Sequence, residues 1–189
     1  ALPIYNKNAV QVIVGLSVPQ LRERFEDLLH DDNCTHDEKS PSLLAFASGK
    51  ITAIEDVPDK AFSEKTMGTG IAIIPDKGII TAPADGTVVM TTDKTGHALG
   101  LMLTTGMEIL IYIGIDTVKM NGDGFKTMVK PQDEVKAGDE LIKFDIEKIK
   151  QAGFDPITVM VITNFDQYTA LQFEKTNEAE AGKTIIATY

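Results

Sequence analysis

The 189-residue sequence predicts an all-β fold, an antiparallel β-sandwich or barrel with short helices, preceded by a separate strand–helix fragment. From Leu43 onward, short apolar stretches rich in β-branched residues alternate with glycine and proline, a pattern typical of antiparallel strands. Before that point, one apolar run and one amphipathic helical pattern are followed by a polar stretch that ends in proline. We therefore expect a strand–helix fragment over 1–30, a linker over 31–42 and the main domain over 43–189.

The composition narrows the classes of partner. The chain has 28 acidic and 18 basic residues, a formal net charge of −10 that repels phosphate backbones and anionic lipid and so disfavours nucleic acid as a partner. No apolar run approaches the ~20 residues of a membrane span, and the first residues lack the pattern of a secretion signal. The single cysteine, Cys34, can form no internal disulfide, which is consistent with a reducing compartment. We expect a soluble segment that lies in the cytoplasm.

The N-terminal fragment reads as one strand and one helix. The run "AVQVIVG" ends at Gly15, Ser17 can cap a helix, Pro19 suits its first turn and Gln20 completes a capping-box spacing. One face of this helix is apolar: Leu21, Phe25, Leu28 and Leu29. Because a lone strand and helix cannot bury such a face, the fragment requires a partner surface.

The main domain shows six apolar stretches that predict its strands: "ASGKITAIEDV", "GTGIAIIPDKGIITAPADGTVVMTT", "GHALGLMLTTGMEILIYIGI", "VKAGDELIKFD", "ITVMVITN" and "KTIIATY". The one clear internal helix is "DIEKIKQAG", with Asp145 as its cap and Gly153 as its stop. The stretch Gly122-Asp123-Gly124 lacks the lysine and the following helix of a nucleotide-binding loop, so we expect a turn there.

The segment Gly106–Gly122, "GMEILIYIGIDTVKMNG", alternates between an apolar and a mixed face. The apolar face carries Met107, Ile109, Ile111, Ile113 and Ile115, and the other face carries Glu108, Leu110, Tyr112, Gly114 and Asp116. If Thr105-Gly106 is the two-residue turn of a hairpin, Leu99 lies opposite Tyr112 and His97 lies diagonal to it.

On this face a hydroxyl, an imidazole, a phenol and a carboxylate converge, from Thr95, His97, Tyr112 and Asp116. The residues alone leave two interpretations open, a functional site or an ordinary hydrogen-bonded histidine–tyrosine pair. His97 is the only histidine of the main domain, since His30 and His36 lie in or beside the linker, so a zinc site of ordinary stoichiometry cannot be assembled. We expect no metal and no cofactor.

Several motifs, in order, carry a resemblance to a known family: "SGKITAIEDVPDKAFSEKTMGTGIAIIPDKGIITAPADGTVV", "TGHALG", "GMEILIYIGIDTVKMNGDGF" and "VKAGDELIKFD". Over about residues 41–189 the chain closely resembles the IIA domain of glucose-type sugar phosphotransferase systems. The resemblance implies a β-sandwich phosphocarrier of the glucose-permease IIA type. Such domains take a phosphoryl group from the small carrier HPr on one histidine and pass it to a cysteine of a IIB domain, while a second histidine and a threonine steady the phosphate.

Carried over by this resemblance, the second histidine matches His97, the threonine matches Thr95, and the position of the phosphorylated histidine is occupied by Tyr112. The same resemblance assigns a rim around the phosphate: Phe62, Gly114, Asp116 and Val118.

The replacement of histidine by Tyr112 changes the chemistry. A neutral imidazole is a nucleophile near pH 7 and keeps phosphate at a high transfer potential, whereas a phenol has a pKa of about 10 and forms a stable ester. We therefore expect a domain that keeps the family's docking surface and cannot run the relay. His97 is a poor substitute acceptor, because the family geometry aims it to support the phosphate.

The N-terminal run "VQVIVG" with "SVPQLRERFEDLL" resembles the last strand and helix of a IIB domain, without a IIB phosphorylation motif. A IIB tail before a IIA domain implies a cut from a permease ordered IIC, IIB, IIA, whose IIC domain would lie in the membrane.

Two alternatives to a silenced phosphocarrier stay open. One is a regulatory or docking module; the retention of Phe62, Thr95, His97 and Asp116 favours instead a recent or engineered loss. The other is a zinc hydrolase of related β architecture, which the shortage of histidines disfavours.

Overall fold

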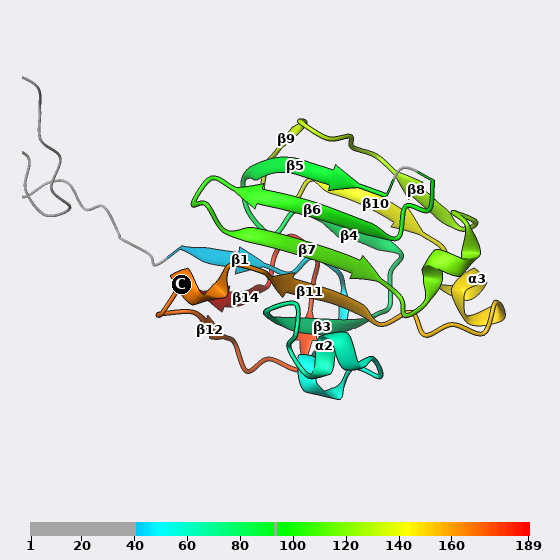
Figure 1. The fold of residues 1–189 in the computed structure, drawn as a ribbon, viewed down its shortest axis with the longest axis horizontal. Coiled ribbons are helices and arrows are strands. Elements are labelled where there is room, and N and C mark those ends of the chain that lie inside the picture. Colours follow the sequence, from blue (N-terminus) through cyan, green and yellow to red (C-terminus); the bar gives the residue numbers. More distant parts are fainter. Residues whose placement is uncertain (1–40, 93) are drawn as a thin grey trace, which may run out of the picture. The chain divides into compact units, whose positions relative to one another are not determined.

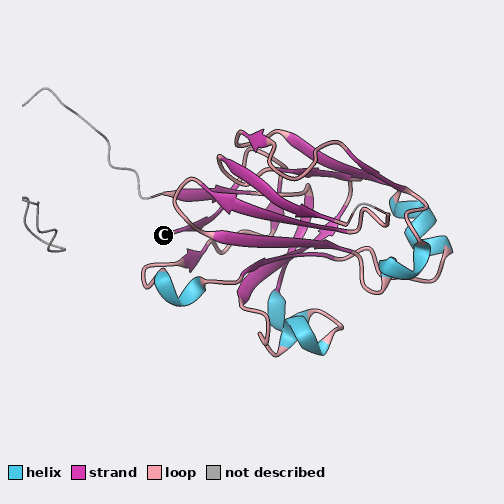
Figure 2. Ribbon diagram, turned by 45° about the horizontal axis from the view of Figure 1, so that its top comes forward, coloured by secondary structure: helices cyan, strands magenta, loops and turns pink. Residues whose placement is uncertain are grey.

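The computed structural model describes residues 41–92 and 94–189. The expected strand–helix fragment over 1–30 and residues 31–40 of the expected linker, including Cys34, lie outside the described residues, whereas Ser42, the last residue of that linker, begins the first described strand. Within them the strands pair antiparallel throughout, and helices are confined to short segments at the edges of the sheets (Figures 1 and 2). The predicted all-β fold class is confirmed.

The described residues form one large sheet and two small ones. The large sheet has eight strands in the order β13 (Glu178–Ala179), β2 (Gly49–Ala53), β3 (Thr69–Pro75), β11 (Thr158–Ile162), β7 (Glu108–Ile113), β6 (Ala98–Leu103), β5 (Gly86–Thr91) and β9 (Glu134–Val135). One small sheet is β1 (Ser42–Leu44), β14 (Ile185–Thr188) and β12 (Gln172–Phe173), and the other is β4 (Ile79–Thr81), β10 (Glu140–Phe144) and β8 (Phe125–Thr127). All six predicted apolar stretches form strands, whereas short edge strands such as β9 and β13 were not predicted.

Two α-helices occur among the described residues. The predicted one is confirmed as α3 (Ile146–Gln151): the Asp145 carboxylate accepts the Lys148 N–H at 3.0 Å, and Gly153 ends the turn at φ +83°. The other, α2 (Lys60–Ser63), is too short for a periodic signal. Three 3₁₀ turns complete the list: η1 (Ile54–Asp56), η2 (Thr117–Met120) and η3 (Phe165–Gln167). No helix within 41–92 and 94–189 has the length and apolarity to span a bilayer.

The core lies on both faces of the large sheet. The main cluster fills the space between the large sheet and the two small ones and includes Ile109, Ile111 and Ile113 of β7. A second cluster covers the opposite face, where η1 and α2 pack on β3, β11 and β7. Strand β7 is therefore covered on both faces, and Tyr112 packs in the second cluster.

The hairpin register differs from the predicted one by one residue. Ala98, not Leu99, pairs with Tyr112, and the loop between β6 and β7 has three residues, Thr104 to Gly106, rather than two. Gly106 stands at φ +84°, which is the left-handed position that closes a three-residue hairpin loop.

The predicted alternation along β7 holds from Met107 to Ile113 and then breaks. Ile115 was expected on the inner face but packs in the outer cluster with Leu110 and Tyr112. The reason is Gly114, whose φ of +69° interrupts the extended backbone and reverses the following residue.

Candidate functional site

The site is centred on Tyr112, near the end of β7. In the sheet Tyr112 has Ala98 of β6 on one side and Val159 of β11 on the other. Both neighbours have apolar side chains smaller than the tyrosine, so the half-buried Tyr112 ring stands in apolar surroundings. A central strand with neighbours on both sides gives the ring a fixed base.

The loop before β6 delivers Thr95 and His97 to this ring. The loop is tied at its base by Thr92, whose hydroxyl donates to the Ala98 C=O and accepts the Ala98 N–H, both at 3.1 Å. Gly96 stands at φ +60° and donates its N–H to the Thr92 C=O at 2.7 Å. The result is a tight turn that places the Thr95 hydroxyl 2.6 Å from His97 Nδ1.

His97, Tyr112 and Phe62 form an aromatic row. The His97 and Tyr112 rings meet edge to face with centroids 4.9 Å apart, and the Tyr112 and Phe62 rings are tilted at 5.5 Å. Phe62 lies on α2, which begins where the Asp59 carboxylate accepts the Ala61 N–H at 2.7 Å. The cap of a four-residue helix thus fixes one wall of the site.

Backbone hydrogen bonds to the segment just before β11 hold the turn after Tyr112 in place. The Gly114 N–H donates to the Ile157 C=O at 3.1 Å, and the Ile115 N–H donates to the Asp155 C=O at 2.8 Å. Thr117, which is fully buried, donates its hydroxyl to the Ile113 C=O at 2.5 Å. This places Asp116 at the surface, where its carboxylate pairs with Lys119 at 2.7 Å.

Burial sets the protonation states of the two central rings. Desolvation lowers the pKa of His97, so its imidazole is neutral at pH 7. Desolvation also raises the pKa of Tyr112, and the carboxylates of Asp116 and Asp59 raise it further, so its hydroxyl stays protonated. The site therefore holds a neutral imidazole beside a neutral phenol.

The structure brings together most of the residues that the sequence singled out. Thr95, His97, Tyr112 and Phe62 are in a continuous row of contacts, and Asp116 is close enough to act on the phenol electrostatically. Val118, on η2, is 42% exposed and extends the apolar surface next to the turn.

Two residues of the site were missed by the sequence interpretation. Asp59 is the N-cap of a helix of only four residues, and Thr117 was not among the residues that the sequence singled out. A cap signal, an aspartate just before a lysine–alanine–phenylalanine run, was the one feature that could have located α2. Nothing in the sequence shows that the Thr117 hydroxyl turns inward.

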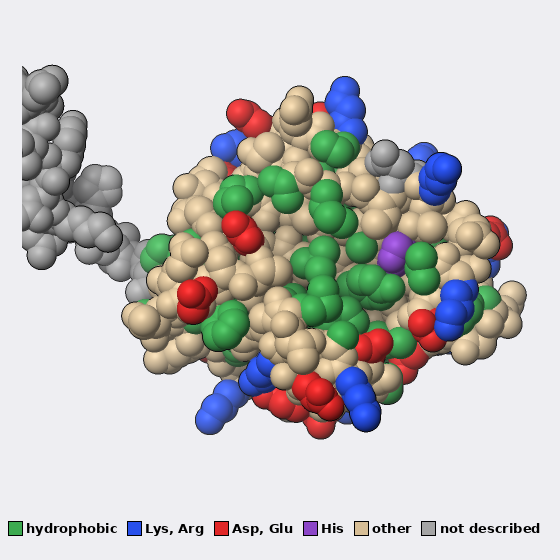
Figure 3. Space-filling view, viewed as in Figure 1, with side chains coloured by type: hydrophobic (Ala, Val, Ile, Leu, Met, Phe, Trp, Pro, Cys, Tyr) green, Lys and Arg blue, Asp and Glu red, His purple; other side chains and the backbone are tan. Residues whose placement is uncertain are grey.

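The surface around the site is apolar. In Figure 3, hydrophobic side chains gather around the one histidine in view, over the region where β6, β7 and β11 run in Figure 1. Charged side chains lie at the margins of this surface rather than in it. Within the described residues, no group of three or more histidine, cysteine, aspartate or glutamate side chains is arranged to hold a metal ion.

The fold and the site together define a β-sandwich domain with a half-buried aromatic site on the face of its large sheet. The model of the family "phosphoenolpyruvate-dependent sugar phosphotransferase system, EIIA 1" matches residues 41–168, and the chain belongs to this family. The resemblance to glucose-type IIA domains is thereby confirmed.

Relatives from several bacteria agree with this assignment. The glucose-specific EIIA component of Halalkalibacterium halodurans is 38% identical over 161 residues, which cover 84% of this chain and 92% of that protein. The corresponding component of Bacillus cereus is 41% identical over 145 residues, 77% of this chain and 87% of the relative. The beta-glucoside-specific EIIBCA component of Bacillus subtilis is 37% identical over 166 residues, 86% of this chain but only 27% of that longer protein.

A solved structure shows the same fold. The glucose permease IIA from Mycoplasma capricolum matches with a TM-score of 0.72 at 33% sequence identity, and the match covers 79% of this chain and 95% of that structure. The predicted sandwich of the glucose-permease IIA type is confirmed.

Proposed function

We propose that this chain is the IIA phosphocarrier domain of a sugar phosphotransferase permease in which Tyr112 occupies the phospho-acceptor position, so that it does not relay phosphate from HPr to a IIB domain. The observation that carries the proposal is the row Thr95–His97–Tyr112: a hydrogen-bonded imidazole lies in edge contact with a phenol at the position assigned to the acceptor. The supporting pair is present, and the nucleophile beside it is of the wrong type.

The phenol of Tyr112 lacks the means of activation that a nucleophile requires. Its pKa is raised by burial and by the carboxylates of Asp116 and Asp59, so the phenolate is scarce at pH 7. Within 41–92 and 94–189 its hydroxyl forms no hydrogen bond to a base, and its contact with His97 joins ring edge to ring face. A hydroxyl without a base within hydrogen-bond reach is a weak nucleophile.

His97 does not replace the missing acceptor. Its Nδ1 is hydrogen-bonded to the Thr95 hydroxyl at 2.6 Å, which leaves Nε2 as the other ring nitrogen, and the residue is only 7% exposed. A nitrogen that attacks a phosphoryl group must approach it in line, in a near-attack geometry. The rings of His97 and Tyr112 meet edge to face, an arrangement in which the tyrosine restricts access to the imidazole.

The proposed partners are HPr as phosphate donor and the IIB domain of the same permease. The apolar surface around the site supports docking of a protein partner, since exposed apolar patches with a charged margin are typical of such interfaces (Figure 3). The name of the Bacillus subtilis relative, an EIIBCA component, supports a parent chain in which IIA is joined to IIB and to a membrane-bound IIC domain. We place the IIA domain on the cytoplasmic side and assign residues 1–30 to the end of IIB.

A regulatory docking module is the second candidate. The observation that favours it is that Val118 and the apolar surface remain open while the acceptor is chemically inert. Both candidates require HPr to bind, and they differ in what a restored histidine would do.

The test is phosphate uptake from phosphoenolpyruvate through Enzyme I and HPr. We expect the chain and Tyr112→Phe to stay unlabelled, whereas Tyr112→His takes up one acid-labile phosphate per chain. Tyr112→Phe is the matched control because it keeps the ring and removes the hydroxyl. Binding of HPr to all three proteins is followed by NMR titration, which reports docking independently of transfer.

Acid-stable phosphate on the chain and none on Tyr112→Phe would mean that the tyrosine is itself an acceptor and would refute the proposal. Acid-labile phosphate on the chain that disappears in His97→Gln would refute it in a different way, by making His97 the acceptor. Binding of HPr without labelling of Tyr112→His would leave the docking module as the better description.

A further inference from the structure

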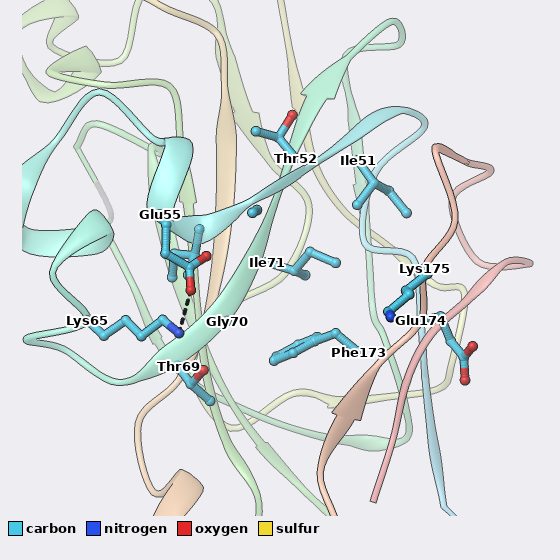
Figure 4. A pocket seen from close by; sticks show the side chains of 12 residues that line it. Ile51, Thr52, Glu55, Lys65, Thr69, Gly70, Ile71, Phe173, Glu174 and Lys175 are labelled. Atoms are coloured by element: carbon cyan, nitrogen blue, oxygen red, sulfur yellow. Dashed lines mark ion pairs between the residues drawn. The ribbon is translucent and has the colours of Figure 1, made fainter.

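A pocket lies beside β2 and β3, and none of the residues that line it belongs to the site around Tyr112. It has a volume of about 260 Å³ and is bounded by β2, β3 and the chain just after β12 (Figure 4). Its floor is apolar, formed by Ile51, Ile71 and the ring of Phe173. The volume is close to the lower end of the range of small-molecule pockets, which begins at about 300 Å³.

One wall of this pocket is charged but electrically balanced. Lys65 and Glu55 form an ion pair at 2.6 Å that is drawn on the left of Figure 4. The hydrogen bond from Lys65 lowers the pKa of Glu55, so this carboxylate stays ionised and neutralises the lysine. A ligand therefore meets no net charge at this wall.

The opposite wall carries one ammonium group with no acid partner. The Lys175 side chain extends toward Phe173 and the floor, whereas the neighbouring Glu174 carboxylate turns away (Figure 4). Within the described residues, Lys175 forms no ion pair. An unpaired cation over an apolar floor is a complementary site for an anion that has an apolar body.

The edge of β2 adds a backbone donor. Ile51 donates its N–H outward to the Asn177 C=O at 2.9 Å, away from β3. Because alternate residues of an antiparallel strand direct their N–H groups to the same side, the Ala53 N–H also points away from β3, toward the pocket that it lines. Lys175 and the Ala53 N–H are both suited to a carboxylate.

We propose that the pocket bounded by Ile51, Ile71, Phe173 and Lys175 binds a small amphiphilic monocarboxylate, a free medium-chain fatty acid being the fitting class. The apolar floor takes the chain and Lys175 takes the head group. Phosphate esters fit poorly, because Lys175 is the one unpaired cation among the described residues that line the pocket, and the Glu174 carboxylate at the margin repels a second negative charge. The pocket shares no lining residue with the site around Tyr112, so the proposal can be tested independently of the role of Tyr112.

The test is titration of the ¹⁵N-labelled chain with octanoate, followed by two-dimensional NMR. We expect saturable shifts at Ala53, Gly70 and Lys175, with the site of Tyr112 unaffected. Octan-1-ol, which has the chain without the charge, and acetate, which has the charge without the chain, should each bind at least about tenfold more weakly, as expected for loss of a charge-assisted hydrogen bond or of apolar burial.

Lys175→Gln should weaken octanoate binding about tenfold, since it removes the one charged anchor and leaves the apolar floor intact. Lys126→Gln is the matched control: it removes the same charge from β8, outside this pocket, and should leave the affinity unchanged. Equal binding of octanoate and octan-1-ol, an unchanged affinity in Lys175→Gln, or shifts that map to the surface around Tyr112 would each overturn the proposal.

Discussion

The two ends of β7 are held in different ways. At the hairpin end, exposed side chains supplement the backbone hydrogen bonds of the loop: the Asn164 amide donates to the Gly106 C=O at 2.9 Å, and the Thr105 and Tyr189 hydroxyls are hydrogen-bonded at 3.0 Å. At the site end, the fastening is backbone to backbone through Gly114 and Ile115, with the buried Thr117 hydroxyl closing the turn.

This difference has a physical meaning. A hydrogen bond at the surface competes with water and can be lost at small cost, whereas a buried one leaves an unsatisfied group when it is broken. We therefore expect substitutions at the hairpin end to cost less unfolding free energy than substitutions at the site end. A site that has to place an aromatic row within tenths of an ångström belongs at the end of the strand that cannot shift.

The largest difference between the two ends of β7 is expected when a glycine at each end is replaced by alanine. Both Gly114 (φ +69°) and Gly106 (φ +84°) adopt left-handed backbone, so alanine at either carries a strain of about 1–2 kcal/mol. At Gly114 a Cβ would also lie 2.4 Å from the Thr117 methyl and 2.9 Å from the Asp155 C=O, whereas at Gly106 its nearest neighbour is the Tyr168 hydroxyl at 3.6 Å. We expect Gly114→Ala to lose about 3 kcal/mol of unfolding free energy and Gly106→Ala about 1 kcal/mol, measured by urea denaturation. Equal losses of unfolding free energy in the two variants would show that the backbone at the site end can shift to accommodate the added Cβ.

The second test removes one hydroxyl at each end. Thr117→Val keeps the shape and deletes the donor to the Ile113 C=O, so we expect a loss of about 1–3 kcal/mol in unfolding free energy. Thr105→Val deletes an exposed hydroxyl and should cost less than about 0.5 kcal/mol. Thr117→Ser, which restores the donor, should recover most of the loss. If Thr117→Ser is as unstable as Thr117→Val, the methyl group and not the hydrogen bond holds the turn.

The same contrast explains what the sequence could predict. Alternation along β7 identified the strand and its inner face, because burial against a core imposes a period of two. The register of the hairpin was off by one, since it depends on whether Gly106 closes a two- or a three-residue loop, and glycine is compatible with both. The reversal of Ile115 depends on the backbone angle of Gly114, for which the sequence carries no periodic signal.

The sequence predicted which residues lie together at the candidate site but not the contacts that hold them in place, and the roles that the resemblance assigns to these residues stay predictions. The family resemblance located Tyr112, His97 and Thr95, because the motif keeps their order along the chain. The side chains of Asp59 and Thr117 form hydrogen bonds to backbone atoms, and such contacts depend on how separate segments pack. The positions that hold a site in place are set by tertiary structure and leave only a faint local trace.

The smallest expected effect is electrostatic, and it tests whether solvent reaches His97 at the site end of β7. Burial lowers the pKa of His97 in the folded chain below its unfolded value of about 6.5. Between these two values the unfolded chain binds more protons, so stability falls as the pH decreases from about 6.5 through the folded pKa and then levels off.

We expect the His97 Cε1 proton to titrate in NMR with a midpoint below 6.5. The decrease in unfolding free energy from pH 7.5 to pH 5 should also be larger for the chain than for His97→Gln. The carboxylates titrate in both proteins, and their contribution cancels in this difference. A midpoint at or above 6.5 would mean that water reaches the imidazole. The contacts of His97 with Thr95 and Tyr112 would then not shield it from solvent, contrary to the structure.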